Sequence, residues 1–247
     1  MKTTLVITHI VEWLKTYAIN ANVNGFVVGV SGGVDSAVTS TLCAMTGLDV
    51  MCLEMPIHQA ESHVSRAQEH IEQLKKRFPN VQSTRIDLTP VFESFKSEIN
   101  LEGSASTVDM ALANSRARLR MTTLYYYAGL LGKLVAGTGN KVEDFGVGFY
   151  TKYGDGGVDI SPIADCNKTE VWELGKELGI LNEIIEAAPT DGLWDDGRTD
   201  EGQLGLQYRE LEEAMNNPNS PNRAKYETIR KQNLHKMEPI PVCKIPN

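Results

Sequence analysis

Six residues near the start of the chain, Ser31-Gly32-Gly33-Val34-Asp35-Ser36, have the types and spacing needed to bind phosphate groups. They follow an apolar run at residues 26–30, typical of a buried parallel strand, and they precede residues 37–45, which suit a helix. In such a strand–loop–helix unit, the loop N–H groups and the helix dipole favour an anion, and glycines let phosphate oxygens approach the backbone closely. The lysine of the ordinary nucleoside-triphosphate loop is missing, and Asp35 indicates a bridging metal ion instead.

A second group of chemistry-bearing residues lies in GTGNKVEDFGVGFYTKYGDGGVDIS, at positions 137–161. The segment follows a predicted strand, so it belongs at the same sheet edge as the first loop. Glu143 can reach a metal ion held by Asp35, although on its own it is better explained as a solvated residue at a helix start. Glycine-rich backbone lets a ligand come close, and charged residues within it seldom serve a core. Three such residues are Lys152, Asp155 and Asp159.

The elements that must position these residues alternate along the chain. Beyond the first unit, we predict strands at 50–53, 81–88 and 133–137 and helices at 62–78, 90–99 and 108–131, with a loop at 102–107. Asn167 and Glu170 have the spacing of a capping box that opens another helix. This alternation predicts an α/β fold, a Rossmann-like parallel sheet with helices on both faces, with ligands at the carboxyl ends of the strands.

Composition narrows the function classes. The 247 residues suit a single domain spanning 1–247, and the net charge of −8 opposes broad attraction to nucleic acid. No apolar stretch approaches the ~20 residues of a membrane span, and the N-terminus has the pattern of an amphipathic helix rather than a signal peptide. The four cysteines are far apart, which favours free thiols over a zinc site. We therefore expect a cytoplasmic protein that needs neither nucleic acid nor membrane.

Residues 191–205 form a long stretch rich in Gly, Asp and Thr without clear periodicity. A loop of this length is usually disordered or functional. Because it follows the candidate site in the sequence, we predict a mobile lid over that site.

Two sets of motifs resemble known families. SGGxDS resembles the pyrophosphate loop of the N-type ATP pyrophosphatases, which split ATP between the α and β phosphates. The wider pattern is similar to NAD synthetase, and it runs in order from near the N-terminus to residue 236. Its pieces are GTxNxxE at 137–143, FxTKYGDGGxDxxP at 149–162, Lys168 near a helix start, and PTxxL at 189–193.

This resemblance implies a reaction, a fold of the adenine nucleotide alpha hydrolase type, and roles for individual residues. The nicotinate carboxylate of deamido-NAD is adenylated by ATP with release of pyrophosphate, and ammonia then attacks the acyl adenylate to give NAD and AMP. The implied ATP-binding residues are Gly29, Val30, Ser31, Gly32, Gly33, Val34, Asp35, Ser36, Thr138, Lys168 and Thr190. Those implied for deamido-NAD are Arg118, Lys152, Asp159, His235 and Lys236. Asp35 and Glu143 would hold Mg²⁺, Asp155 would lie near the ammonia, and Lys152 and Lys168 would act with it in catalysis.

Two departures from the pattern concern ATP. Val34 stands where many members have Gln, and residues 54–59 lack the arginine that several relatives place near adenine, so the adenine contacts stay open.

Alternative functions remain at this point. They are a tRNA-modifying ATP pyrophosphatase, a GMP-synthetase-like amidating enzyme, and a non-catalytic nucleotide sensor. The absence of paired cysteines argues against the first, the glycine-rich 149–157 segment against the second, and the complete set of charged residues against the third. The resemblance also implies a homodimer that acts on small molecules. We expect free ammonia as nitrogen source, because the chain leaves no room for the amidase domain of glutamine-dependent relatives.

Overall fold

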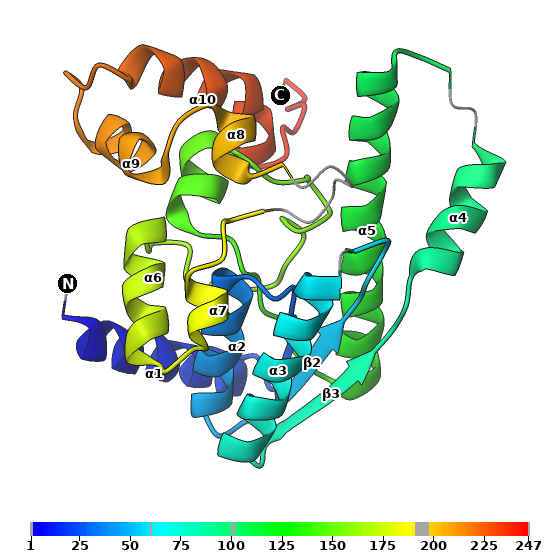
Figure 1. Ribbon diagram of the computed structural model, residues 1–247, viewed down its shortest axis with the longest axis vertical. Coiled ribbons are helices and arrows are strands. Elements are labelled where there is room, and N and C mark those ends of the chain that lie inside the picture. Colours follow the sequence, from blue (N-terminus) through cyan, green and yellow to red (C-terminus); the bar gives the residue numbers. More distant parts are fainter. Residues whose placement is uncertain (1, 60, 100–101, 191–197, 247) are drawn as a thin grey trace.

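A four-stranded parallel sheet organises the chain in this computed structural model, which describes residues 2–59, 61–99, 102–190 and 198–246 (Figure 1). The strands are β1 (Gly25–Gly29), β2 (Asp49–Glu54), β3 (Val81–Arg85) and β4 (Leu134–Val135), in the order β3-β2-β1-β4. β1 is central, and its Phe26 pairs with Val50 on one side and Leu134 on the other. An isolated parallel bridge between Ala136 and Ile160 continues the pairing beyond β4.

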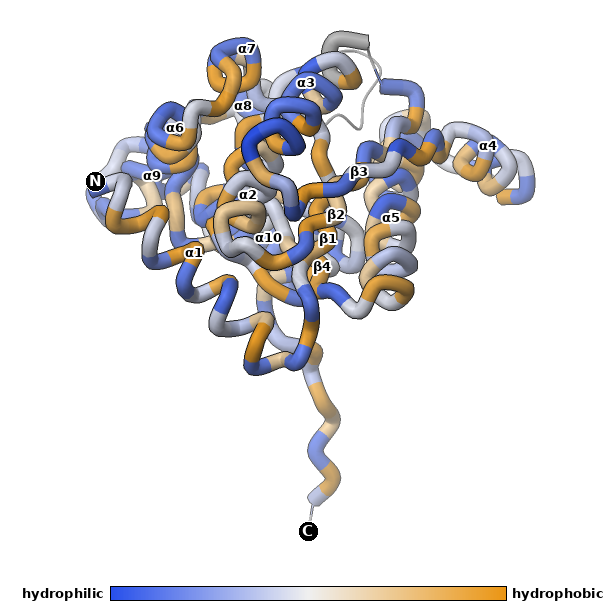
Figure 2. The backbone as a smooth tube through the Cα atoms, turned by 90° about the horizontal axis from the view of Figure 1, so that it is seen from below, coloured by the Kyte–Doolittle hydropathy of each residue, from blue (hydrophilic) through white to orange (hydrophobic). Residues whose placement is uncertain are grey.

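Helices cover both faces of this sheet, as the alternation of elements predicts. The helices of the described residues are α1 (Thr3–Asn20), α2 (Val34–Met45), α3 (Glu61–Arg77), α4 (Thr89–Glu98), α5 (Ala105–Leu131), the π-helix η1 (Lys141–Val147), α6 (Lys168–Glu177), α7 (Asn182–Ile185), α8 (Asp200–Leu204), α9 (Tyr208–Asn216) and α10 (Arg223–Met237). Figure 2 shows α2 and α3 on one side of the strands and α4 and α5 on the other. In the part of the chain that is described, none of these helices combines the length and the apolar character needed to cross a membrane.

The core follows the two-residue period of the strands. Phe26 and Val28 of β1 belong to the apolar cluster shared with α1, α2, α3 and α6, whereas Val27 between them belongs to the cluster shared with α4 and α5. All three side chains are fully buried. Because successive strand residues point to opposite faces, an almost continuous apolar run is required when both faces are covered.

A third apolar cluster lies beyond the sheet and joins η1 to α8, α9 and α10. Tyr208 and Leu211 of α9 are buried in it together with Val147 of η1. Figure 1 shows α9 and α10, in orange and red, at the end of the molecule remote from α1. Residues of α8, α9 and α10 in this cluster pack against η1, the helix that carries Glu143.

Most predicted elements are confirmed, with differences at their ends. Helix α5 begins at Ala105 rather than 108, because the Ser104 side chain caps it by accepting a hydrogen bond from the Thr107 N–H (3.3 Å). Strand β3 ends at Arg85 rather than 88, and β4 spans two residues because Ala136 turns to pair with Ile160. The capping box is confirmed and opens α6.

Only part of the predicted lid at 191–205 lies among the residues that the structure describes. Residues 191–197 lie outside the described residues. The remainder is not irregular throughout, because Asp200–Leu204 forms helix α8, capped by the Thr199 side chain at one end and by Gly205 in the left-handed conformation at the other.

Candidate active site

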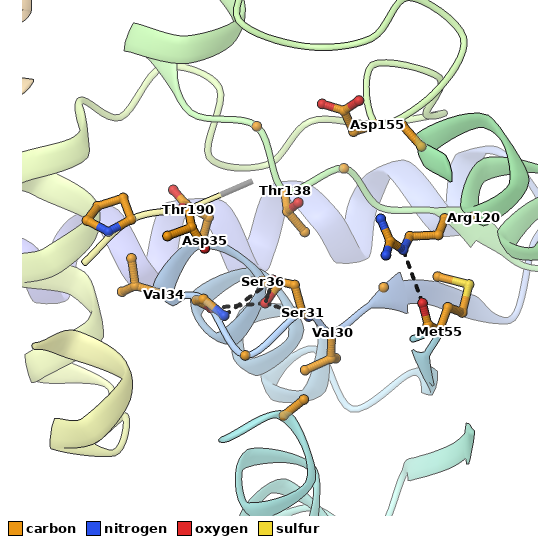
Figure 3. A pocket seen from close by; sticks show the side chains of 18 of the residues that line it. Val30, Ser31, Val34, Asp35, Ser36, Met55, Arg120, Thr138, Asp155 and Thr190 are labelled. Carbon is orange, nitrogen blue, oxygen red and sulfur yellow. Dashed lines mark hydrogen bonds between the residues drawn. The ribbon is translucent and has the colours of Figure 1, made fainter. Parts of the chain in front are cut away.

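The predicted phosphate-binding loop lines a cavity of about 250 Å³ at the carboxyl ends of β1 and β2 (Figure 3). Every residue that the sequence assigned to ATP, metal or ammonia lines the same cavity: Gly29 to Ser36, Thr138, Glu143, Asp155, Lys168 and Thr190. These residues come from β1, α2 and the loop between them, the segment after β4, η1, the loop between η1 and α6, α6, and the segment after α7. The sheet edge therefore brings together residues that are up to about 160 positions apart in the chain.

The loop itself is ordered by short-range contacts. Gly32 has a φ of +85°, a left-handed conformation in which a side chain would be strained. The Ser36 hydroxyl donates to the Gly33 carbonyl (2.9 Å) and accepts from the Ser31 N–H (3.2 Å). Helix α2 begins at Val34, directly after Gly33, so Ser36 lies in its first turn. Its first-turn N–H groups have no partner within the helix, so they are available to phosphate oxygens.

Lys168 joins the two carboxylates that the sequence proposes as metal ligands. Its Nζ donates to Asp35 Oδ2 at 2.5 Å and to Glu143 Oε1 at 3.0 Å. The lysine side chain is 3% exposed, and those of Asp35 and Glu143 are 17% and 16% exposed. The capping box at Asn167 fixes the start of α6, and this places Lys168, the first residue of the helix, at the cavity.

Asn140 fixes Glu143 relative to the loop. The fully buried Asn140 side chain accepts from the N–H groups of Val142 and Glu143 and so caps η1. Its amide donates to Asp35 Oδ1 at 3.0 Å. One amide therefore links the start of the π-helix to the phosphate-binding loop, and π-helical turns occur frequently at functional sites.

Charge and burial act against each other in this network. Burial raises the pKa of Asp35, and the Glu143 charge adds to that effect against the opposing Lys168 ammonium. For Glu143, burial is outweighed by Lys168, Tyr208 and Asn140, which lower its pKa. Burial alone would lower the pKa of Lys168, but the two carboxylates together raise it. Lys168 therefore stays protonated and compensates one of two nearby negative charges.

Asp155 lies at another wall of the cavity, near a further carboxyl group. Its Oδ1 accepts from the Thr151 N–H at 3.0 Å. Burial, followed by the Asp155 charge, raises the pKa of Asp144 well above its usual value. The Asp144 carboxylate fills the space beside Gly139, where an added Cβ would lie 1.8 Å from Oδ2. The Lys236 ammonium acts against this rise, so Asp144, Asp155 and Lys236 influence one another at this wall of the cavity.

The five residues assigned to the dinucleotide lie outside the lining of this cavity. Four of them form a separate group: Arg118, Lys152, His235 and Lys236. The Arg118 guanidinium donates to the Lys152 carbonyl (3.3 Å), and the Lys152 Nζ donates to the His235 carbonyl (3.1 Å). Lys236 donates to the Tyr150 carbonyl at 2.7 Å. The 149–157 loop is thereby tied to both α5 and α10.

Asp159 stands apart from that group. Its Oδ1 accepts from the Tyr125 hydroxyl (2.9 Å) and its Oδ2 from the Val135 N–H (2.8 Å). Both oxygens thus join the end of β4 to α5, a contact that stabilises the sheet edge.

Protein ligands alone do not make a metal site here. Among residues 2–59, 61–99, 102–190 and 198–246, no group of three or more His, Cys, Asp or Glu side chains is placed to hold a metal ion. Asp35 and Glu143 supply two carboxylates, and both accept hydrogen bonds from the Lys168 ammonium. A Mg²⁺ ion is usually bound by one or two carboxylates, with waters and substrate phosphates completing its six ligands. The donor set therefore fits an ion that arrives with a polyphosphate.

Three residues of the network had no role assigned from the sequence: Asn140, Asp200 and Tyr208. The Tyr208 hydroxyl donates to Glu143 at 2.5 Å and lies 3.3 Å from Asp200 Oδ2. The GTxNxxE motif already contains Asn140, so this residue carried a signal. Tyr208 carried none, because a tyrosine at a helix start is unremarkable in sequence.

Comparisons with known proteins identify similar chains. A sequence profile of the NAD synthase family matches residues 6–245. A protein named NH(3)-dependent NAD(+) synthetase from Carboxydothermus hydrogenoformans is 39% identical over 209 residues, covering 82% of this chain and 81% of the relative. A relative of the same name from Alkaliphilus oremlandii is 36% identical over 251 residues, covering 97% and 96%. A structure described as NMN synthetase from Francisella tularensis has a TM-score of 0.89 and 32% identity, covering 100% of this chain and 99% of that one.

Proposed function

The chain belongs to the NAD synthase family, and we propose that it amidates the nicotinate carboxylate of deamido-NAD with ammonia at the expense of ATP. The products are NAD, AMP and pyrophosphate, and the intermediate is an acyl adenylate. The observation that carries this proposal is the single cavity in which the phosphate-binding loop, Asp35, Glu143, Lys168 and Asp155 meet. A carboxylate is a poor acyl donor until ATP converts it to an acyl adenylate. Adenylation of the carboxylate and attack of ammonia on the acyl adenylate must therefore occur in one place.

We assign ATP to the loop side of this cavity. The first-turn N–H groups of α2 would bind phosphate oxygens, as would the Lys168 ammonium once it turns from its carboxylates. Asp35 and Glu143 would hold Mg²⁺, which neutralises the phosphate charge that develops as pyrophosphate leaves. Thr138 and Thr190 line the same cavity and would contact ATP.

We assign ammonia to the Asp155 side. Most ammonia is protonated near neutral pH, whereas the nucleophile is NH₃. The Asp155 carboxylate can bind the ammonium ion and help to remove its proton next to the acyl adenylate. The rate at low ammonium concentration should therefore rise with pH above neutrality.

The dinucleotide is assigned to the group formed by Arg118, Lys152, His235 and Lys236. The cationic side chains of Arg118, Lys152 and Lys236 lie around the 149–157 loop and suit a substrate with two phosphates. Asp159 fixes the adjoining sheet edge, so its part in binding would be indirect.

We also propose a homodimer. Tyr126 and Leu130 lie one turn apart on α5 and are 63% and 64% exposed. Large apolar side chains repeated on one helix face mark a contact surface when they form a contiguous patch.

A second candidate substrate is nicotinate mononucleotide. The protein described as NMN synthetase matches this chain over its whole length with a TM-score of 0.89. Both substrates present the same nicotinate carboxylate, so the reacting residues would be the same, and only the adenylate half of deamido-NAD distinguishes them.

One assay tests these proposals together. Pyrophosphate release is measured with ATP, Mg²⁺ and ammonium chloride, and with deamido-NAD, nicotinate mononucleotide, xanthosine monophosphate or bulk tRNA as acceptor. We expect turnover with deamido-NAD. A higher kcat/KM for the mononucleotide would assign the second substrate, and turnover only with xanthosine monophosphate or tRNA would refute both. Robust amidation with glutamine alone, in ammonia-free reagents, would refute the assignment of ammonia.

A further inference from the structure

Tyr208 contacts the proposed metal site but has no role in the reaction described above. Its hydroxyl donates to Glu143 Oε1 at 2.5 Å, and Asp200 Oδ2 lies 3.3 Å away as a second acceptor. Glu143 Oε1 also accepts from Lys168. The tyrosine therefore touches one of the two carboxylates proposed to hold the metal ion.

The tyrosine ring is held in place. Tyr208 is 1% exposed, and its ring packs edge-on against Trp172 with the ring centroids 5.9 Å apart. The Lys168 ammonium lies 4.9 Å from the centroid of the same ring. Because the ring is fixed, the hydroxyl oxygen stays beside Glu143 even if the Lys168 ammonium moves toward a phosphate.

The hydroxyl has one proton to donate and two carboxylates beside it. The shorter distance, 2.5 Å against 3.3 Å, makes Glu143 the main acceptor. A donor that binds one oxygen of a carboxylate fixes the direction of the other oxygen. Groups that orient metal ligands in this way typically contribute 10–100-fold to metal affinity or activity.

We propose that Tyr208 is a positioning residue that orients Glu143 for the metal–ATP complex. The inference rests on the proposed function, because it assumes that Glu143 binds a metal ion together with ATP. Tyr208 itself touches neither ATP nor the reacting carboxylate in this assignment. It acts through Glu143, and its effect must vanish when Glu143 can no longer bind a cation.

The test is a double-mutant cycle on ATP binding, measured by calorimetry without any acceptor substrate, so that no reaction occurs. Tyr208→Phe removes only the hydroxyl. We expect ATP affinity in Mg²⁺ to fall about tenfold and affinity in EDTA to stay unchanged. In a Glu143→Gln background, the same change should have no effect on ATP affinity in Mg²⁺.

Tyr226→Phe is the matched control. Tyr226 is buried in the same apolar cluster, 5% exposed, and makes no described hydrogen bond through its hydroxyl to the site carboxylates. We expect it to leave ATP affinity unchanged under both conditions. An equal loss of affinity in Mg²⁺ and EDTA for Tyr208→Phe, or an equal loss in the Glu143→Gln background, would overturn the inference. Failure of deamido-NAD as a substrate would refute the proposed function but would leave this binding result unaffected.

Discussion

Replacing Lys168 by Met should reveal how strongly one ammonium holds two buried carboxylates together. The substitution keeps most of the apolar length of the side chain but removes the donor to Asp35 at 2.5 Å and to Glu143 at 3.0 Å. Removing one partner of a buried ion pair typically costs about 3–5 kcal/mol, because the remaining charge stays buried without compensation. Since whole domains are stable by only about 5–15 kcal/mol, this loss is large enough to measure by urea denaturation.

The dependence of this loss on pH follows from the same contacts. Without the ammonium, burial and the Glu143 charge raise the pKa of Asp35 unopposed by Lys168, and Glu143 loses the main influence that lowers its pKa. Both pKa values therefore rise, and the native variant binds more protons than the native wild type. Such a group contributes stability at low pH and loses it as pH rises through the folded pKa. The difference in unfolding free energy between wild type and Lys168→Met should therefore be larger at pH 8 than at pH 5.

The matched control is Lys141→Met, which removes an exposed ion pair. Lys141 lies 2.9 Å from Asp165, and the two side chains are 38% and 98% exposed. Exposed pairs contribute about 0–1 kcal/mol. If Lys168→Met costs no more than Lys141→Met, or if its cost is the same at pH 8 and pH 5, the reasoning about the buried network is wrong. Mg²⁺ should also stabilise Lys168→Met more than the wild type, because ion and ammonium compete for the same carboxylates.

Three further predictions concern other parts of the molecule. Asp35→Asn should keep the circular dichroism spectrum but lower pyrophosphate release by about 100-fold or more, because a ligand of the proposed Mg²⁺ is lost; near wild-type turnover in Mg²⁺ would contradict the assignment. Gly32→Ala should cost about 1–2 kcal/mol of unfolding free energy and weaken ATP binding, since Gly32 has a φ of +85°; unchanged thermal stability and ATP affinity would count against this. His70 is fully buried, its Nε2 lies 2.9 Å from Ser40 Oγ, and burial, aided by Arg77, lowers its pKa from 6.5 to about 4. As the pH falls, His70 is protonated in the unfolded chain before it is protonated in the folded protein. The free energy of unfolding should therefore fall by about 2 kcal/mol between pH 7 and pH 5 because of this one side chain. His70→Gln should remove that part of the pH dependence in denaturation curves, and an unchanged slope would assign it elsewhere.

Residue types and spacing predicted the parts of this protein whose contacts are local. The phosphate-binding loop is closed by hydrogen bonds within Ser31 to Ser36, and the capping box of α6 lies within Asn167 to Glu170, so residue type and spacing were sufficient. The alternation of strands and helices likewise predicted a parallel sheet with helices on both faces. That sheet also predicted that the loops at 31–36 and 137–161 lie at its carboxyl edge.

Tertiary structure alone decided which side chains meet. Lys141 is close to Glu143 in the sequence but pairs with Asp165. Lys168 reaches both Asp35 and Glu143, from 133 and 25 positions away. Asn140 reaches Asp35 across 105 positions, and Tyr208 reaches Glu143 across 65. Periodicity fixes the direction of a side chain relative to its own helix or strand, but a contact between two elements depends on how they pack.

The same limit explains the position of Asp159. Its place among glycines beside the TKYGDGG motif predicts a substrate contact, which stays a prediction. The packing of β4 against α5 brings both its oxygens onto Val135 and Tyr125. Position within a motif indicates that a residue matters to the site. Whether it touches the ligand or supports the backbone beneath it depends on neighbours that are distant in sequence, because only folding brings them within hydrogen-bonding distance.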